Sequence, residues 1–215
     1  MILDTTEVLT ITEPALSRGA PLAAFAGQIT HAADARPMIV LVAAAGSEQA
    51  AMDRRAAGLG VTGDVYTRAN LVTLPARENA QRLSGLLTML GVESALLDPA
   101  LFAPITRSSP LEAEPRLLHA KRFEQAAREA RVLVLAGGVG RTPDGHLTSL
   151  GSGGATLSGL FVAQRLGLPA RLVVGEHDAG FTPPKRALLF ARRHGLSYTV
   201  SPRAEPARDP EPVSA

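Results

Sequence analysis

The residues of this 215-residue chain that could do chemistry gather in one stretch, 132–174, where short apolar runs alternate with glycine clusters. One cluster is GGVG at 137–140, and another, GSGG at 151–154, precedes a segment with the apolar spacing of a helix. Glycine lets the backbone approach a ligand closely, and a helix N-terminus presents unpaired N–H groups and the positive end of its dipole. The pattern predicts a phosphate or carboxylate site at 152–156. The alternative, that the glycines only make tight connections between strands and helices, stays open.

Two familiar phosphate-binding motifs do not fit this stretch. Gly138 and Gly140 begin like a dinucleotide fingerprint, but that motif leads directly into a helix, whereas the Pro-Asp-Gly at 143–145 predicts a turn. The Gly-x4-Gly-Lys-Ser/Thr loop needs a lysine, and residues 132–174 contain none. The glycines therefore do not indicate either of these nucleotide sites.

Composition narrows the classes of protein to which the chain could belong. The hydrophobic fraction of 46% is ample for a core, and a net charge of +2 predicts no strong attraction to nucleic acid or membranes. The chain has no cysteine, and His146 and His177 are isolated, so neither thiolate chemistry nor a metal site is predicted. No apolar run approaches the ~20 residues of a membrane span, and the N-terminus is acidic where a signal peptide is basic. We expect a soluble, cytoplasmic protein.

Apolar runs and helical periodicity alternate along the chain. Strands are predicted at 8–11, 38–44, 93–97, 132–136, 171–174 and 197–200. Helices are predicted at 16–33, 49–57, 77–90, 116–130, 156–166 and 186–193. Ser47 is a candidate N-cap, residues 58–74 carry two β-like patches, Pro75 is expected to precede a helix, and 98–115 reads as a proline-rich loop.

This alternation predicts an α/β fold, a single three-layer α/β/α domain with a mainly parallel central sheet. The domain is expected to cover residues 1–200, and the proline-rich residues 201–215 to form a disordered tail. Ligands of such sheets bind at the carboxyl ends of the strands. The glycine loops, the turn at 45–47 and the loop after Val174 should therefore converge there.

The central stretch resembles the amino acid kinase family, and aspartokinases most closely. That family has a Gly-x-x-Gly loop, a hairpin with Asp/Glu-Gly, and Thr-x-Leu-Gly-Arg-Gly-Gly-Ser-Asp opening a helix; residues 137–140, 144–145 and 148–156 stand in the same order and spacing. Residues 175–186 are similar, without a gap, to the aspartokinase nucleotide loop. Residues 77–79 resemble the family's Gly-Glu-Arg segment.

The resemblance implies an ATP-dependent kinase for a small carboxylate or amino acid, with ATP and Mg²⁺ as cofactors. It also implies a homo-oligomer or a pairing with another subunit. The residues implied in nucleotide binding are Gly175, Asp178, Phe181, Thr182, Lys185 and Arg186. Those implied in binding the acceptor or another anion are Glu78, Gly138, Ser152, Gly153 and Gly154. For most of these side chains a structural role, in the core, a turn or a solvated helix start, is the alternative.

The sequence departs from the family pattern at the positions that take part in the chemistry. The family opens with Lys-Phe-Gly-Gly-Thr-Ser, whereas residues 10–15 here are TITEPA, with a glutamate, Glu13, and no lysine or glycine. The arginine that grips the substrate carboxylate is replaced by Ser152. Phosphoryl transfer depends on cationic stabilisation of the transferred group. Two hypotheses follow: a kinase with altered or reduced activity, or a degenerate member that binds a ligand or a partner subunit without catalysis.

Overall fold

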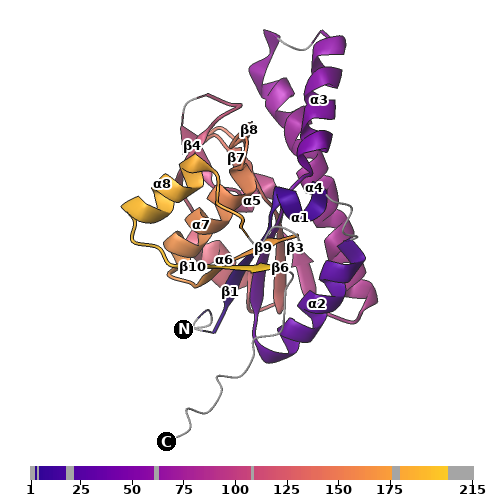
Figure 1. The fold of residues 1–215 in the computed structure, drawn as a ribbon, viewed down its shortest axis with the longest axis vertical. Helices are drawn as coiled ribbons and strands as arrows, with labels where there is room; N and C mark the ends of the chain where they lie inside the picture. Colours follow the sequence, from indigo (N-terminus) through magenta and orange to yellow (C-terminus); the bar gives the residue numbers. More distant parts are fainter. Residues whose placement is uncertain are drawn as a thin grey trace, which may run out of the picture.

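The computed structural model describes residues 3, 5–17, 22–60, 63–107, 109–175 and 180–202, and its centre is a six-stranded, all-parallel sheet (Figure 1). The strand order is β10-β9-β1-β2-β6-β3. These strands are β1 (Glu7–Ile11), β2 (Met38–Val42), β3 (Ser94–Leu96), β6 (Val132–Ala136), β9 (Ala170–Val174) and β10 (Tyr198–Pro202). The predicted parallel α/β sheet is confirmed.

Helices cover both faces of this sheet. They are α1 (Glu13–Ser17), α2 (Leu22–Ala35), α3 (Gly46–Gly58), α4 (Val65–Met89), α5 (Pro99–Phe102), α6 (Ala120–Ala126), α7 (Gly154–Leu166) and α8 (Lys185–Arg193). Alternate residues of β2 divide the core, since Val40 packs with α2 and α4 on one face and Leu41 with α6, α7 and α8 on the other. Burial on both faces explains why the strands are continuous apolar runs.

A smaller four-stranded sheet, β5-β4-β7-β8, stands at the edge of the domain. Its strands are β4 (Ile105–Arg107), β5 (Glu114–Leu117), β7 (Val139–Arg141) and β8 (Leu147–Ser149). The hairpin β7–β8 is the turn predicted at 143–145, and it connects the end of β6 to α7. It places the second glycine cluster beside the first, because Leu150 N donates to Gly138 O at 2.9 Å.

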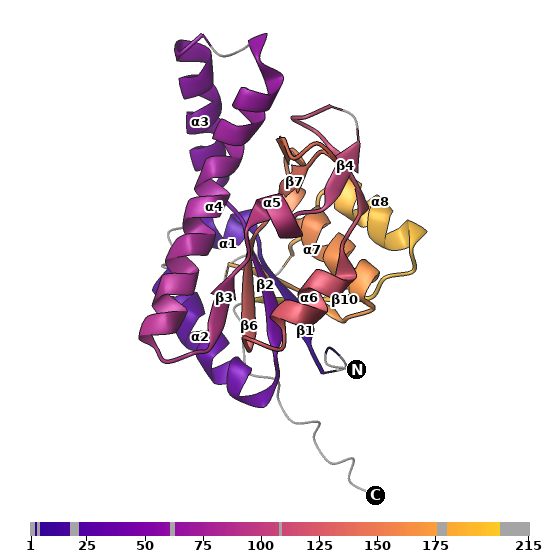
Figure 2. The same ribbon diagram turned by 180° about the vertical axis from the view of Figure 1, so that it is seen from behind.

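The prediction for residues 58–74 was wrong, because α4 is one helix from Val65 to Met89 with Pro75 inside it. Asp64 caps the helix by accepting from Tyr66 N and Thr67 N at 3.0 and 3.1 Å. The segment forms a helical pair with α3 that extends beyond the sheet, as the view from behind also shows (Figure 1, Figure 2). Aromatic and β-branched residues suggested strands, but packing against α3 overrides that local preference.

Four other features differ from the predictions. The helix predicted at 16–33 is two helices, α1 and α2, and the one predicted at 116–130 is the short α6, preceded by β5. The segment 98–115 contains α5 and β4 rather than only a loop. Ser47 is not the N-cap of α3; that position is Ala45, whose N–H donates to Glu48 Oε2 at 3.0 Å. No helix in the part of the chain that the structure describes is long and apolar enough to cross a membrane.

Candidate functional site

The carboxyl ends of β1 and β2 meet the start of α7 at a cleft of about 600 Å³, here called the central cleft. Its lining comes from α1, α3, α4, the segment before β5 and the loop between β8 and α7. Gly46, Gly151 and Ser152 all lie in this lining. This confirms the predicted convergence for the β2 turn and the second glycine cluster, whereas the first cluster is not in this lining and residues 176–179 of the loop after Val174 lie outside the described residues.

Close packing of glycines sets the position of α7. A Cβ at Gly159 would overlap with Thr10 Oγ1 of β1, and a Cβ at Gly137 would lie 2.8 Å from that of Ala155. Gly153, with φ of +68°, is the left-handed residue before the helix, and a Cβ there would overlap with the ring of Pro184. These contacts explain several of the glycines structurally. They also hold the first turn of α7 at the edge of the central cleft.

Glu13 lies at the N-terminus of α7. It is the first residue of α1, immediately beyond β1, and its Oε1 accepts a hydrogen bond from Gly153 N at 3.1 Å. Burial raises the pKa of the Glu13 carboxyl, and the hydrogen bond from Gly153 partly offsets that rise. The chain therefore places its own carboxylate where the sequence predicts an external phosphate or carboxylate. Any anion that binds there must displace Glu13 or lie against its charge.

The raised pKa of Glu13 predicts how the stability of the folded protein depends on pH. The folded protein holds this proton more tightly than the unfolded chain, so the stabilisation is present below the ordinary pKa of 4.5 and is lost as pH rises through the folded value. Glu13→Gln keeps an acceptor for Gly153 N–H but does not ionise. As the pH rises from 4.5, we expect the melting temperature of Glu13→Gln to increase relative to that of the wild type, as measured by differential scanning calorimetry. The control is Glu129→Gln, because Glu129 is exposed. A melting temperature of the wild type that increases relative to that of Glu13→Gln over this pH range would contradict the assignment.

Within the described lining of the central cleft, the cationic side chain already forms an ion pair. Arg68 is the one lysine or arginine there, and it pairs with Asp53 through Nε–Oδ1 and NH2–Oδ2 hydrogen bonds of 2.7 and 2.9 Å. Glu13 and Glu112 add two more carboxylates to the same lining. The Arg68–Asp53 pair could not be predicted from the sequence, because it joins α3 to the first half of α4, which has no helical pattern of its own. The described lining of the central cleft therefore holds more carboxylates than cations.

The residues implied in nucleotide binding extend from the end of β9 to the first turn of α8. Arg186 donates to three backbone carbonyls, Leu150 O at 2.6 Å, Ala113 O at 3.0 Å and Glu112 O at 3.3 Å, so its guanidinium joins α8 to the start of α7 and to the segment before β5. Lys185 and Thr182 are exposed. Phe181 is half-buried, Gly175 directly follows β9, and Asp178 lies outside the described residues. Their role in binding a nucleotide stays a prediction.

The residues implied in acceptor binding are divided between two places. Ser152 is exposed in the central cleft and Gly153 and Gly154 follow it into α7. The N–H of Gly138 is used internally, donating to Ser158 Oγ at 3.0 Å. Glu78 is exposed on α4, where it pairs with Arg82 one turn away.

Asn79, rather than Glu78, is the buried polar residue on this part of α4. Its Nδ2 donates to Ala43 O at 3.2 Å and so connects α4 to the loop after β2. The helical spacing of Asn79 with buried Ala76 and Leu83 could have identified it from the sequence. In the described residues, no group of three or more His, Cys, Asp or Glu could hold a metal ion.

No family model and no curated protein matches this sequence. Among solved structures, aspartate kinase from Synechocystis is similar with a TM-score of 0.73 and 18% identity, covering 95% of this chain and 40% of that one. An isopentenyl phosphate kinase matches with a TM-score of 0.63 and 13% identity, covering 94% and 93% of the two chains. Uridylate kinase from Archaeoglobus fulgidus matches with a TM-score of 0.56 and 15% identity, covering 90% of this chain and 89% of that one. The chain therefore has the fold of the amino acid kinase family.

Proposed function

We propose that this chain is a ligand-binding protein built on the amino acid kinase fold, in which the position of the transferred phosphate has been taken over by Glu13. The observation that carries the proposal is the hydrogen bond from Gly153 N to Glu13 Oε1 at 3.1 Å. A second anion about 4 Å from this carboxylate would face a repulsion of about 4 kcal/mol at an effective dielectric constant near 20. Because 1.4 kcal/mol is a tenfold change in affinity, that repulsion weakens phosphate binding about a thousandfold.

The chemistry of the central cleft suggests what it binds instead. Its lining offers the carboxylates of Glu13 and Glu112, hydroxyls at Ser149 and Ser152, and the Gln49 amide, with Arg68 neutralised by Asp53. Such a set suits a small molecule with several hydrogen-bond donors, an amine or a polyol. In this reading the protein binds a donor-rich ligand and does not transfer phosphate.

The second candidate is an ATP-dependent phosphotransferase for a small carboxylate or amino acid, using Mg²⁺. It is favoured by the likeness in fold to three different kinases and by the meeting of strand ends at one cleft. This candidate needs Glu13 to move away from Gly153 when a nucleotide arrives. The homo-oligomer or paired subunit and the cytoplasmic location expected from the sequence are further parts of the proposal, and light scattering of the purified protein tests the oligomer.

A thermal-shift screen separates the two candidates. We expect amines and polyols to stabilise the wild type, and we expect the effect to be lost in Glu13→Ala. ATP and ADP with magnesium should produce no shift, although a ligand at 100 times its dissociation constant would add about 2.7 kcal/mol. A nucleotide-dependent shift, followed by transfer of phosphate to any acceptor, would overturn the first candidate in favour of the second.

A further inference from the structure

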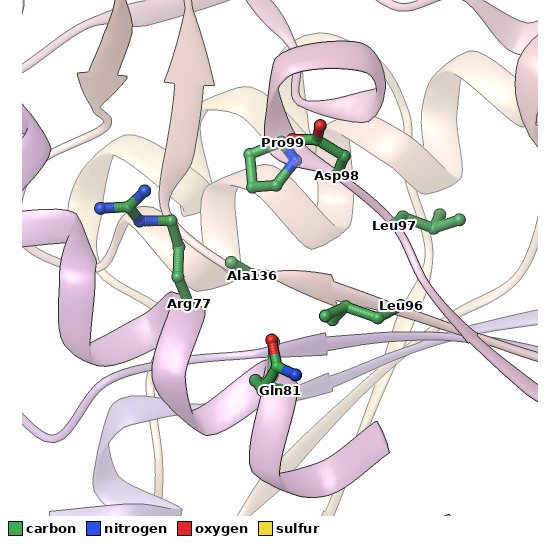
Figure 3. Close-up of a pocket in the computed structure, with 8 residues that line it drawn as sticks. Arg77, Gln81, Leu96, Leu97, Asp98, Pro99 and Ala136 are labelled. Carbon is green, nitrogen blue, oxygen red and sulfur yellow. The ribbon is translucent and has the colours of Figure 1, made fainter. Parts of the chain in front are cut away.

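A second cavity, of about 300 Å³, lies between α4 and the carboxyl ends of β3 and β6 (Figure 3). It shares no lining residue with the central cleft. Two oppositely charged side chains take part in the lining, Arg77 from α4 and Asp98 from the turn after β3, and Figure 3 shows them on opposite sides of the cavity. We call it the Arg77 pocket.

The guanidinium of Arg77 is only partly satisfied by the protein. Its NH2 donates to Asn70 Oδ1 at 2.6 Å, whereas Nε is buried and has no hydrogen-bond partner in the described structure. Burial lowers the pKa of Arg77, and the charge of Asp98 partly opposes this effect. A partly buried guanidinium with incomplete hydrogen bonding is unfavourable, and because Arg77 lines the cavity, an anion bound there would stabilise its charge.

Asp98 is close enough to influence Arg77 but does not neutralise it. Within the described residues the two side chains form no ion pair, and Asp98 Oδ1 instead accepts from Ala100 N at 2.9 Å as the N-cap of α5. The space between a guanidinium and a carboxylate that do not meet suits a ligand with an acceptor at one end and a donor at the other. The exposed amide of Gln81 lies along the same cavity.

The remaining walls are apolar and small. They come from Ala80, Leu96, Leu97, Pro99 and Ala136, the last residue of β6. Ligand pockets in proteins begin at about this volume and combine mostly apolar walls with a few fixed polar groups. A compact apolar body fits between these walls, and a long or polyanionic molecule does not.

We propose that the Arg77 pocket binds a small organic acid that carries an amino or hydroxyl group and a compact apolar body. The carboxylate pairs with the Arg77 guanidinium, the amino or hydroxyl group donates to Asp98, and the apolar body lies against Leu96 and Ala136. The proposal does not depend on what the central cleft binds, because the two sites have separate linings.

The test is a titration of the ¹⁵N-labelled full-length protein with three related probes, followed through the amide signals of Leu97 and Ala136. Valine has both polar groups, isovalerate lacks the amine, and valinamide lacks the carboxylate. We expect valine to shift both signals saturably, isovalerate to bind about tenfold more weakly, and valinamide not to bind. Absence of any shift at these amides with millimolar valine, or equal binding of valine and valinamide, would overturn the proposal.

Two variants assign the contacts, each with a matched control. Arg77→Lys keeps the charge but removes the planar guanidinium that pairs with a carboxylate, and we expect valine to bind at least about tenfold more weakly. Asp98→Asn keeps an N-cap for α5 but removes the charge, so the preference for valine over isovalerate should be lost. Exposed Arg128→Lys and Asp144→Asn should bind valine as the wild type does. Unchanged valine affinity in Arg77→Lys, or an unchanged preference in Asp98→Asn, would overturn the assignment.

Discussion

Replacing Gly159 with alanine is expected to destabilise the protein by about 2–3 kcal/mol, because the new methyl group has no space between α7 and β1. A Cβ there would overlap with Thr10 Oγ1 and would lie 3.2 Å from Thr10 Cβ. For a domain of this size, that loss lowers the melting temperature by roughly 4–12 °C. The same methyl group would push the start of α7 away from Glu13, so ligand binding in the central cleft should weaken as well.

Gly85→Ala provides the matched control. Gly85 is also inside a helix, α4, but nothing lies within 4 Å of a Cβ there, so alanine should stabilise by about 0.5–1 kcal/mol. Thermal melts of both variants give the comparison. If overlap with Thr10 is the cause, Thr10→Ala should recover part of the loss when combined with Gly159→Ala. Equal stability of the two glycine variants would contradict the close packing of α7 on β1.

Replacing Arg186 with alanine is expected to cost about 2–4 kcal/mol of folding free energy even without any ligand. The guanidinium donates to the carbonyls of Leu150, Ala113 and Glu112, and removing it leaves those groups without a charged donor. Urea denaturation measures the change. A residue that served only to bind a nucleotide would show no such loss in the ligand-free protein.

Lys185→Ala is the control for this experiment, because Lys185 is the neighbouring cation and is exposed. Its removal should change the free energy of unfolding by less than about 0.5 kcal/mol. If both variants unfold like the wild type, Arg186 is only a solvated residue at the start of a helix.

The fold was largely predictable because its strands are buried on both faces. A run such as Met38–Val42 has apolar residues at every position and can be recognised without knowledge of its neighbours. The hairpin and helix that follow β6 are marked by local glycine and turn chemistry. The helix α4 was not predictable in the same way, since Pro75 lies inside it and it depends on contacts with α3 and with β8, which are distant in sequence or not marked by a local pattern.

The candidate site was predictable only in part. The loops that meet at the central cleft follow from the rule for parallel sheets, and the glutamate at position 13 stood out against the family pattern. Its contact with Gly153 joins residues 140 positions apart, and no local pattern specifies such a pair. The same holds for Arg77 and Asp98, whose separation across a pocket depends on how β3 and α4 pack.

A calorimetric titration of magnesium–ATP into the wild type and Glu13→Ala tests whether Glu13 excludes phosphate from the N-terminus of α7. If the carboxylate at Gly153 N–H excludes phosphate, the wild type should release no binding heat at millimolar nucleotide. Glu13→Ala should then bind magnesium–ATP measurably. Its affinity should be roughly a thousandfold higher than that of the wild type, because a repulsion of about 4 kcal/mol has been removed. Saturable binding of magnesium–ATP to the wild type, with the same affinity in Glu13→Ala, would contradict the claim.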